Sequence, residues 1–185
     1  FGVSPQEITS PGAVIESGNL PPGQYLVIPK TETNRATGAM ILPDSAVIDS
    51  PCAQDFDIST FVREAGGFLS SFSQVVAGSR ISGAAVVQRV ADNQSVNPRL
   101  LLAFIEHRAG LVYGDQPPLD IYHPLRMNND YFKGLYQELS LAARMINTGY
   151  YGWRYGDINN IEFSDERSAR IAANLNAGSV GVLNL

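Results

Sequence analysis

Apolar positions recur at helical spacing along much of the chain. Between residues 58 and 72 they return at steps of three and four, which places them on one face of a helix. This face comprises Ile58, Phe61, Val62, Ala65, Leu69 and Phe72. A second helix is predicted after Ser82, a good N-cap, because Val86, Val87 and Val90 follow it. Both patterns predict a helical domain whose apolar faces are buried.

The clearest helix start lies at Asn97 and Pro98, an N-cap residue followed by a proline suited to the first helical position. This third helix should end near Gly110. A fourth helix is predicted from about Asp130, with Gly149 placed to terminate it. A last short helix is predicted from Ser164 to Leu175. The fold class is therefore expected to be mainly α.

The first 54 residues differ from the rest. Residues 1–30 combine a helix start with a Pro-Pro-Gly turn and a β-prone run at Tyr25 to Ile28, which alone indicates a helix and a strand in an N-terminal arm. The stretches "FGVSPQEI" and "LPPGQYLVIP" also resemble the second half of a LysM repeat, without its opening strand. Residues 31–54 have no sustained periodicity and predict a linker or extended arm, so residues 55–185 form the main domain.

The composition and charge of the chain argue against several classes of partner and cofactor. The 185 residues carry a formal net charge of -5 without a dense Lys or Arg run, which argues against nucleic acid as a partner. Cys52 is the single cysteine, so an internal disulfide and a cysteine metal cluster are both excluded. No apolar run reaches the roughly 18 residues of a membrane helix. His123 and the acidic residues show no metal-ligand spacing, and the sequence contains no nucleotide-binding glycine motif. We expect no metal or cofactor.

Three short motifs resemble those of goose-type lysozymes and soluble lytic transglycosylases, and occur in the same order. They are "VNPRLLLAFIEHRAG", which ends near Gly110, "GLYQ" at residues 134–137, and "NLNAG" at residues 174–178. The resemblance implies a lysozyme-like helical domain, an extracytoplasmic location and peptidoglycan as the ligand. In that family one glutamate at a helix end protonates the glycosidic oxygen.

The first motif departs from that family at the catalytic position. Alignment on Ala109 and Gly110 puts Arg108 where the glutamate belongs and leaves Glu106 two positions earlier. Two positions turn a side chain by about 200° around a helix, and the apolar pattern predicts that Arg108 faces inward and Glu106 lies near the border. Arginine cannot act as a general acid. Leu175 also replaces the family's tyrosine, so both changes indicate lost catalysis.

The resemblance assigns a set of glycan-contacting residues. Arg108, Gln137 and Asn176 are the motif positions, and Glu106 is the one candidate catalytic residue. The segment "TGYYGWRYG" adds an aromatic platform suited to stacking on sugars: Tyr150, Tyr151 and Trp153. A structural explanation stays open for each of these residues. Arg108 suits the last turn of a helix, and Asn176 suits a helix-terminal turn. Glu106 and Gln137 could lie on a solvated surface, and the aromatic residues could form a hydrophobic plug.

Three hypotheses of function follow. The first is an extracytoplasmic peptidoglycan-binding protein whose lytic-transglycosylase-like domain has lost its acid. The second is an active muramidase or lytic transglycosylase that uses Glu106 as general acid and base. The third is a structural subunit of a cell-surface assembly with protein partners, which the long arm before residue 54 suggests.

Overall fold

The computed structural model describes residues 9–10, 25–27, 40–50, 53, 55–127, 129–163 and 166–185. The chain forms two compact units, Phe1–Thr37 and Gly38–Leu185. In the first unit an antiparallel bridge pairs Thr9 with Val27, and the Ser10 hydroxyl donates to the Tyr25 carbonyl at 2.9 Å. Most of the LysM-like segment over residues 1–30 lies outside the described residues.

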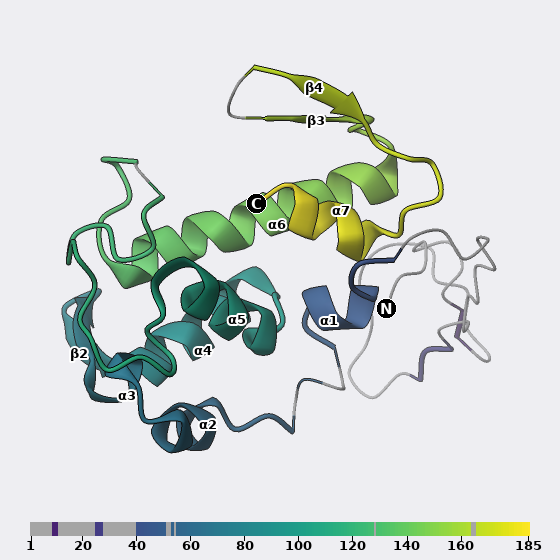
Figure 1. The fold of residues 1–185 in the computed structure, drawn as a ribbon. Helices are drawn as coiled ribbons and strands as arrows, with labels where there is room; N and C mark the ends of the chain where they lie inside the picture. The colour runs from purple at the N-terminus through teal and green to yellow at the C-terminus, as the bar shows by residue number, and fades with distance from the viewer. Residues whose placement is uncertain are drawn as a thin grey trace. The chain divides into compact units, whose positions relative to one another are not determined.

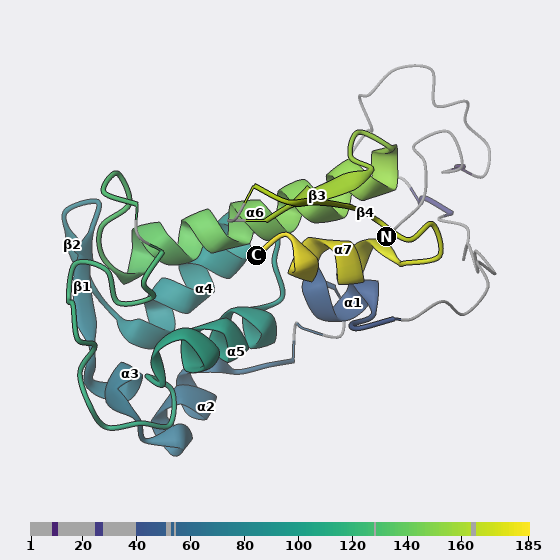
Figure 2. The same ribbon diagram turned by 45° about the horizontal axis from the view of Figure 1, so that its top comes forward.

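The second unit is mainly α, which confirms the predicted class at this level. Its longest helix, α6 (Leu135–Tyr155), packs against α7 (Ala177–Leu183) and α4 (Gly83–Gln94), as Figures 1 and 2 show. Helix α5 (Pro98–Ala109) contacts α4 and α6, and α1 (Asp44–Val47) contacts α7. Helices α2 (Ile58–Ala65) and α3 (Phe68–Ser71) contact α4.

Two small antiparallel hairpins complete the described part of this unit. Strands β1 (Ser73–Val76) and β2 (Ser79–Ser82) pair with Ser73 opposite Ser82 and lead directly into α4. Strands β3 (Asn160–Glu162) and β4 (Ser168–Arg170) pair with Asn160 opposite Arg170 and connect α6 to the segment before α7. Neither hairpin forms part of a larger sheet.

Local capping signals fix three helix starts. The Ser82 hydroxyl accepts the Ala85 N–H at the start of α4, and the Asn97 side chain accepts the Arg99 N–H at the start of α5. Both predicted starts are confirmed, as is the end of α5 at Gly110, which has a positive φ of 63°. At α2 the Asp57 carboxylate accepts the Thr60 N–H at 3.0 Å.

Other predicted boundaries are wrong. The helix expected over residues 58–72 breaks at Gly66, whose φ of 71° ends α2 before α3 begins. Gly149 does not end a helix but lies inside α6, where an added Cβ would stand 2.8 Å from the Val180 carbonyl oxygen. The last helix predicted over 164–175 is also wrong, because residues 168–170 pair with β3 and the helix starts at Ala177.

The larger of two hydrophobic clusters among the described residues holds these helices together. Fully buried side chains from α5 and α6 meet there, among them Ile105, Leu139 and Ile146. Val47, in the segment predicted as a linker or arm, is fully buried in the same core, and its neighbour Ile48 pairs with Val96. No helix among the described residues is long and apolar enough to cross a membrane.

Candidate functional site

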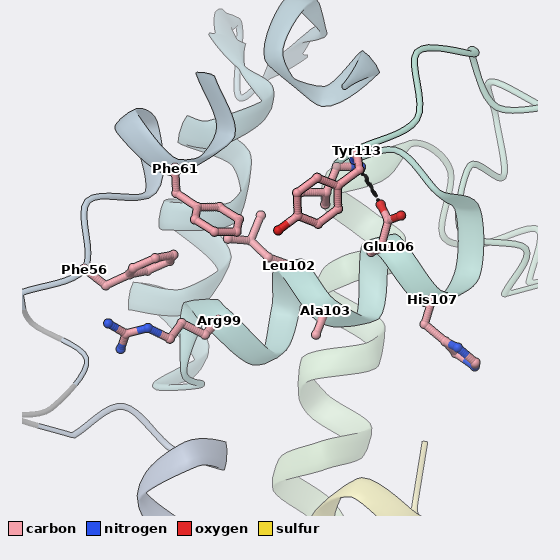
Figure 3. Close-up of a pocket in the computed structure, with 9 residues that line it drawn as sticks. Phe56, Phe61, Arg99, Leu102, Ala103, Glu106, His107 and Tyr113 are labelled. Carbon is pink, nitrogen blue, oxygen red and sulfur yellow. Dashed lines mark hydrogen bonds between the residues drawn. The ribbon is translucent and has the colours of Figure 1, made fainter. Parts of the chain in front are cut away.

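A pocket of about 460 Å³ opens along one face of α5. Arg99, Leu102, Ala103 and Glu106 line its floor, at helical steps of three, four and seven residues from Arg99. Phe56, Phe61, Val112 and Tyr113 form the walls (Figure 3). Arg99 and Phe56 lie at one end and Glu106 at the other, while His107 points away at the rim. His107 is exposed.

The walls form a row of aromatic rings. The ring centroids of Phe56 and Phe61 lie 5.3 Å apart, and those of Phe61 and Tyr113 lie 6.3 Å apart in an edge-to-face arrangement. The Arg99 guanidinium carbon lies 4.3 Å from the Phe56 ring centroid, a cation–π distance. Tyr113 is 61% exposed, so part of this row is accessible to a ligand. The pocket thus combines an apolar wall with a cation at one end and a carboxylate at the other.

Glu106 is positioned by the turn that follows α5. Its Oε2 accepts the main-chain N–H groups of Val112 at 2.9 Å and Tyr113 at 3.1 Å. Its own carbonyl accepts the Gly110 N–H at 2.8 Å, which closes the helix end. Val112 is buried, so the turn packs over the last part of α5 and draws the half-buried Glu106 side chain into the pocket wall.

The predicted inward orientation of Arg108 is wrong, whereas Glu106 is half-buried, as expected near the border of the apolar face. Arg108 is exposed and does not line the pocket, whereas Glu106 does. The buried stripe of α5 ends at Ile105, because the loop beside the last turn presents carbonyl oxygens rather than an apolar surface. Arg108 donates from Nε to the Leu125 carbonyl at 3.0 Å and from a terminal nitrogen to the Arg126 carbonyl at 2.6 Å. It therefore holds a loop and does not fill a cleft.

The same loop is held from the other side by Glu138, the residue after the "GLYQ" motif. Glu138 is fully buried and accepts the Leu125 N–H at 2.6 Å and the Met127 N–H at 3.0 Å. The Nδ1 of His123 lies 3.3 Å from Glu138 Oε1. We call Arg108, Glu138 and the main chain of residues 123–127 the loop clamp. Sequence reasoning missed Glu138, although its place beside Leu135, Leu139 and Ala142 on an apolar helix face was a usable signal.

The structure does not bring the predicted glycan-contacting residues together. Gln137 is exposed in the first turns of α6, thirteen residues before Tyr150, so about 20 Å of helix separates them. Tyr150 is buried, and Trp153 donates from Nε1 to the Leu175 carbonyl at 2.9 Å. Of the aromatic segment, Tyr151 is the predicted contact that reaches the surface, stacked on Tyr155 with centroids 6.1 Å apart.

Asn176 has a structural role at the far end of the unit. Its side-chain amide donates to the Leu42 carbonyl at 2.8 Å and to Asp44 Oδ1 at 2.7 Å, which ties α1 to the start of α7. The Tyr150 hydroxyl donates to Asp44 Oδ2 at 3.3 Å. Burial, together with the nearby Asp44 charge, raises the pKa of Tyr150 to about 12. These contacts explain Asn176 and Tyr150 without a ligand.

The comparisons with known proteins place the chain in a family. The family described as "LasA, N-terminal domain" matches residues 40–185, which is most of the chain and the larger part of its second compact unit. The chain belongs to the LasA N-terminal domain family. No curated protein and no solved structure matched the chain.

Within this LasA N-terminal domain, the pocket along α5 is suited to bind a small molecule or a polymer segment. Its volume lies within the usual range for ligand sites, roughly 300–1,000 Å³. No group of three or more potential metal ligands occurs among the residues that the structure describes. Sequence reasoning identified Glu106 but missed Arg99 on the same helix. It also missed Phe56, Phe61 and Tyr113, because the walls come from segments that only the fold brings to α5.

Proposed function

We propose that this protein is an extracytoplasmic module that binds cell-wall glycan in the pocket along α5, and does not cleave it. The observation that carries the proposal is the aromatic row flanked by Arg99 and Glu106. Aromatic rings pack on the apolar faces of sugars, while polar groups at the pocket ends can pair with hydroxyl and amide groups. The order of the three lysozyme-like motifs supports the same ligand class and a lysozyme-like architecture.

Binding without cleavage follows from how Glu106 is used. A glycosidase acid has to hold a proton and deliver it to the leaving oxygen. Here Oε2 of Glu106 accepts two main-chain N–H groups, so this oxygen serves to hold the turn at residues 112 and 113. Glu106 is also the one carboxyl group among the described residues that line the pocket.

The test compares retention of the protein on purified peptidoglycan with retention of variants. Tyr113→Ala should weaken binding by about five- to tenfold, because it removes an accessible ring from the wall. Tyr131→Ala is the matched control, since Tyr131 is 92% exposed and does not line the pocket. Equal retention of both variants would reject the pocket as the glycan site.

A second candidate function is supported by the position of Glu106 itself. Glu106, rather than Arg108, lines the pocket, so the enzyme hypothesis no longer needs a rotated helix. In that case the purified protein should release soluble fragments from peptidoglycan, and Glu106→Gln should abolish the release. Absence of any release at high protein concentration, with binding intact, favours the binding module.

The description of the family indicates the position of such a domain within a longer chain. An N-terminal domain precedes the remainder of a longer LasA chain, and we propose the same arrangement for this protein. A glycan-binding module in that position would keep the following part of the chain close to the wall. This remains compatible with protein partners at the cell surface.

A further inference from the structure

The loop clamp holds a histidine between two carboxylates. The Nδ1 of His123 lies 3.3 Å from Oε1 of Glu138, and its Nε2 lies 3.7 Å from Oδ1 of Asp130. The His123 side chain is 17% exposed, that of Glu138 is completely buried, and that of Asp130 is 93% exposed. Histidine is the side chain whose charge ordinarily changes between about pH 5 and pH 8. A change of charge at this position therefore acts directly on the clamp.

The buried carboxylate decides what protonation of His123 does. A charged ring is attracted to both carboxylates, but the pair with exposed Asp130 is screened by water and contributes little. The pair with Glu138 is screened much less, because that side chain has no exposure to water. A neutral ring can still donate one hydrogen bond, but it brings no charge to the pair. Protonation therefore strengthens the clamp, chiefly through Glu138.

The cations beside the clamp keep their charge over this pH range. Arg108 reaches the loop from α5 and donates to two loop carbonyl oxygens, and the side chain of Arg126 is exposed on the loop itself. On α6, the guanidinium of Arg144 lies 4.9 Å from the Phe132 ring centroid. Arginine remains protonated throughout. In the described part of the chain, the ion pairs of His123 are those with the two carboxylates, so its ring is the group that can couple pH to the clamp.

The clamp positions an apolar surface. Ile121 and Tyr122, which directly precede His123, are 65% and 66% exposed. The Tyr122 carbonyl accepts the Gly134 N–H at 2.7 Å, so this part of the loop is tied to the residue before α6. Exposed apolar side chains on a held loop offer a partner a surface of fixed shape, whereas a loop that opens presents them in many arrangements.

We propose that His123 makes the loop clamp a pH-sensitive latch. With the ring protonated, the main chain of residues 123–127 is held in place; with the ring neutral, this segment opens more often. The direction is set because the pair of His123 with Glu138 exists only while the loop is closed, so the added stability is present at acidic pH and is lost as pH rises. Acidification should therefore fix the apolar surface formed by Ile121 and Tyr122. This inference does not depend on glycan binding at α5.

The experiment follows opening of the loop in the full chain by amide hydrogen exchange. Protection of the Leu125 and Met127 N–H groups, both bonded to Glu138, is measured by NMR from about pH 5.5 to about pH 8 and corrected for the intrinsic pH dependence of exchange. Protection at both positions should fall about fivefold over this range, as a charged hydrogen-bond partner becomes neutral. An equal fall at N–H groups inside α6 would indicate unfolding of the whole unit and would overturn the latch.

Variants test whether His123 is the responsible group. His123→Gln keeps a donor near Glu138 without a charge, so it should remove the pH dependence and give the protection of the wild type at about pH 8. Asp130→Asn should retain most of the dependence, because Asp130 is exposed. His107→Gln is the matched control, since His107 is the other histidine of the chain and is exposed on α5. A dependence that persists in His123→Gln, or that disappears in His107→Gln, overturns the role of His123.

A second measurement needs only the wild-type protein, so it decides the matter even where His123→Gln fails to fold. The ring resonances of His123 are followed in the same samples as the exchange of Leu125 and Met127. One shared midpoint for the ring resonances and the loss of protection supports the latch. Different midpoints, or protection that stays constant or rises with pH, overturn it.

Discussion

Replacing Glu138 with glutamine alters the loop clamp by a single polar atom. Glu138 accepts one main-chain N–H on each carboxylate oxygen, from Leu125 at 2.6 Å and from Met127 at 3.0 Å. Glutamine keeps one acceptor oxygen and places an NH₂ group where the other oxygen was. One of the two loop N–H groups then faces a donor inside the protein, at a position with no exposure to water.

The expected cost follows from these contacts. A hydrogen bond to a charged group contributes about 1.5–3 kcal/mol, and a buried N–H left without an acceptor costs about 1–3 kcal/mol. The variant also avoids the desolvation of a buried carboxylate, which offsets part of the loss. We therefore expect Glu138→Gln to lower the free energy of unfolding by about 2 kcal/mol.

The assay is urea unfolding of the wild-type protein, Glu138→Gln and the control Glu64→Gln, whose side chain is exposed on α2. The midpoint should fall for Glu138→Gln without a change in the denaturant slope, and the control should match the wild type. Amide exchange should speed up at Leu125 and Met127 before it does so within α6. A change below about 0.5 kcal/mol, or unchanged exchange in the loop, would refute this reading of the clamp.

Three further predictions concern stability. Gly149→Ala should destabilise the protein by about 1–3 kcal/mol in thermal or urea unfolding, because the new methyl group would stand 2.8 Å from the Val180 carbonyl oxygen. An unchanged free energy of unfolding would contradict this and would show that α7 can shift away from α6 at little cost. The pKa of Tyr150 is raised to about 12 in the folded protein, so the contribution of its neutral hydroxyl to the free energy of unfolding is complete below about pH 10 and is lost as pH rises toward 12. Tyr150→Phe should flatten this alkaline dependence of the free energy of unfolding. Main-chain and side-chain hydrogen bonds from Thr60 lower the pKa of Asp57. The contribution of the ionised Asp57 side chain to the free energy of unfolding is therefore present above the ordinary Asp pKa and disappears on further acidification. Asp57→Ala should reduce the acid dependence of the free energy of unfolding, and a pH profile identical to that of the wild type would contradict this.

Local chemistry explains which elements the sequence could predict. The Asn97 cap, Pro98 and Gly110 define α5 through contacts within the helix and its first neighbours, so its bounds can be read from a short window. The same holds for Ser82 at the start of α4. Gly149 illustrates the limit: its lack of a side chain suits a helix end equally well, and only the approach of α7, some thirty residues later, reveals its use.

The candidate site was harder to predict for the same reason. The apolar pattern of α5 places Arg108 on the buried face, but what covers the last turn decides which side chain is enclosed. A turn at residues 112 and 113 covers Glu106, and a loop whose carbonyl oxygens at Leu125 and Arg126 accept from Arg108 lies beside it. A helical wheel contains neither partner. The aromatic wall likewise joins Phe61 and Tyr113, which are far apart in sequence.

The most direct test of glycan binding at α5 is a titration of the isotopically labelled protein with wall disaccharide, followed by the amide resonances in NMR spectra. Binding at α5 should shift the resonances of Val112 and Tyr113, whose N–H groups are bonded to Glu106, with little change around Tyr151 and Tyr155. Shifts confined to the region of Tyr151 and Tyr155, with residues 112 and 113 unmoved at saturation, would contradict it.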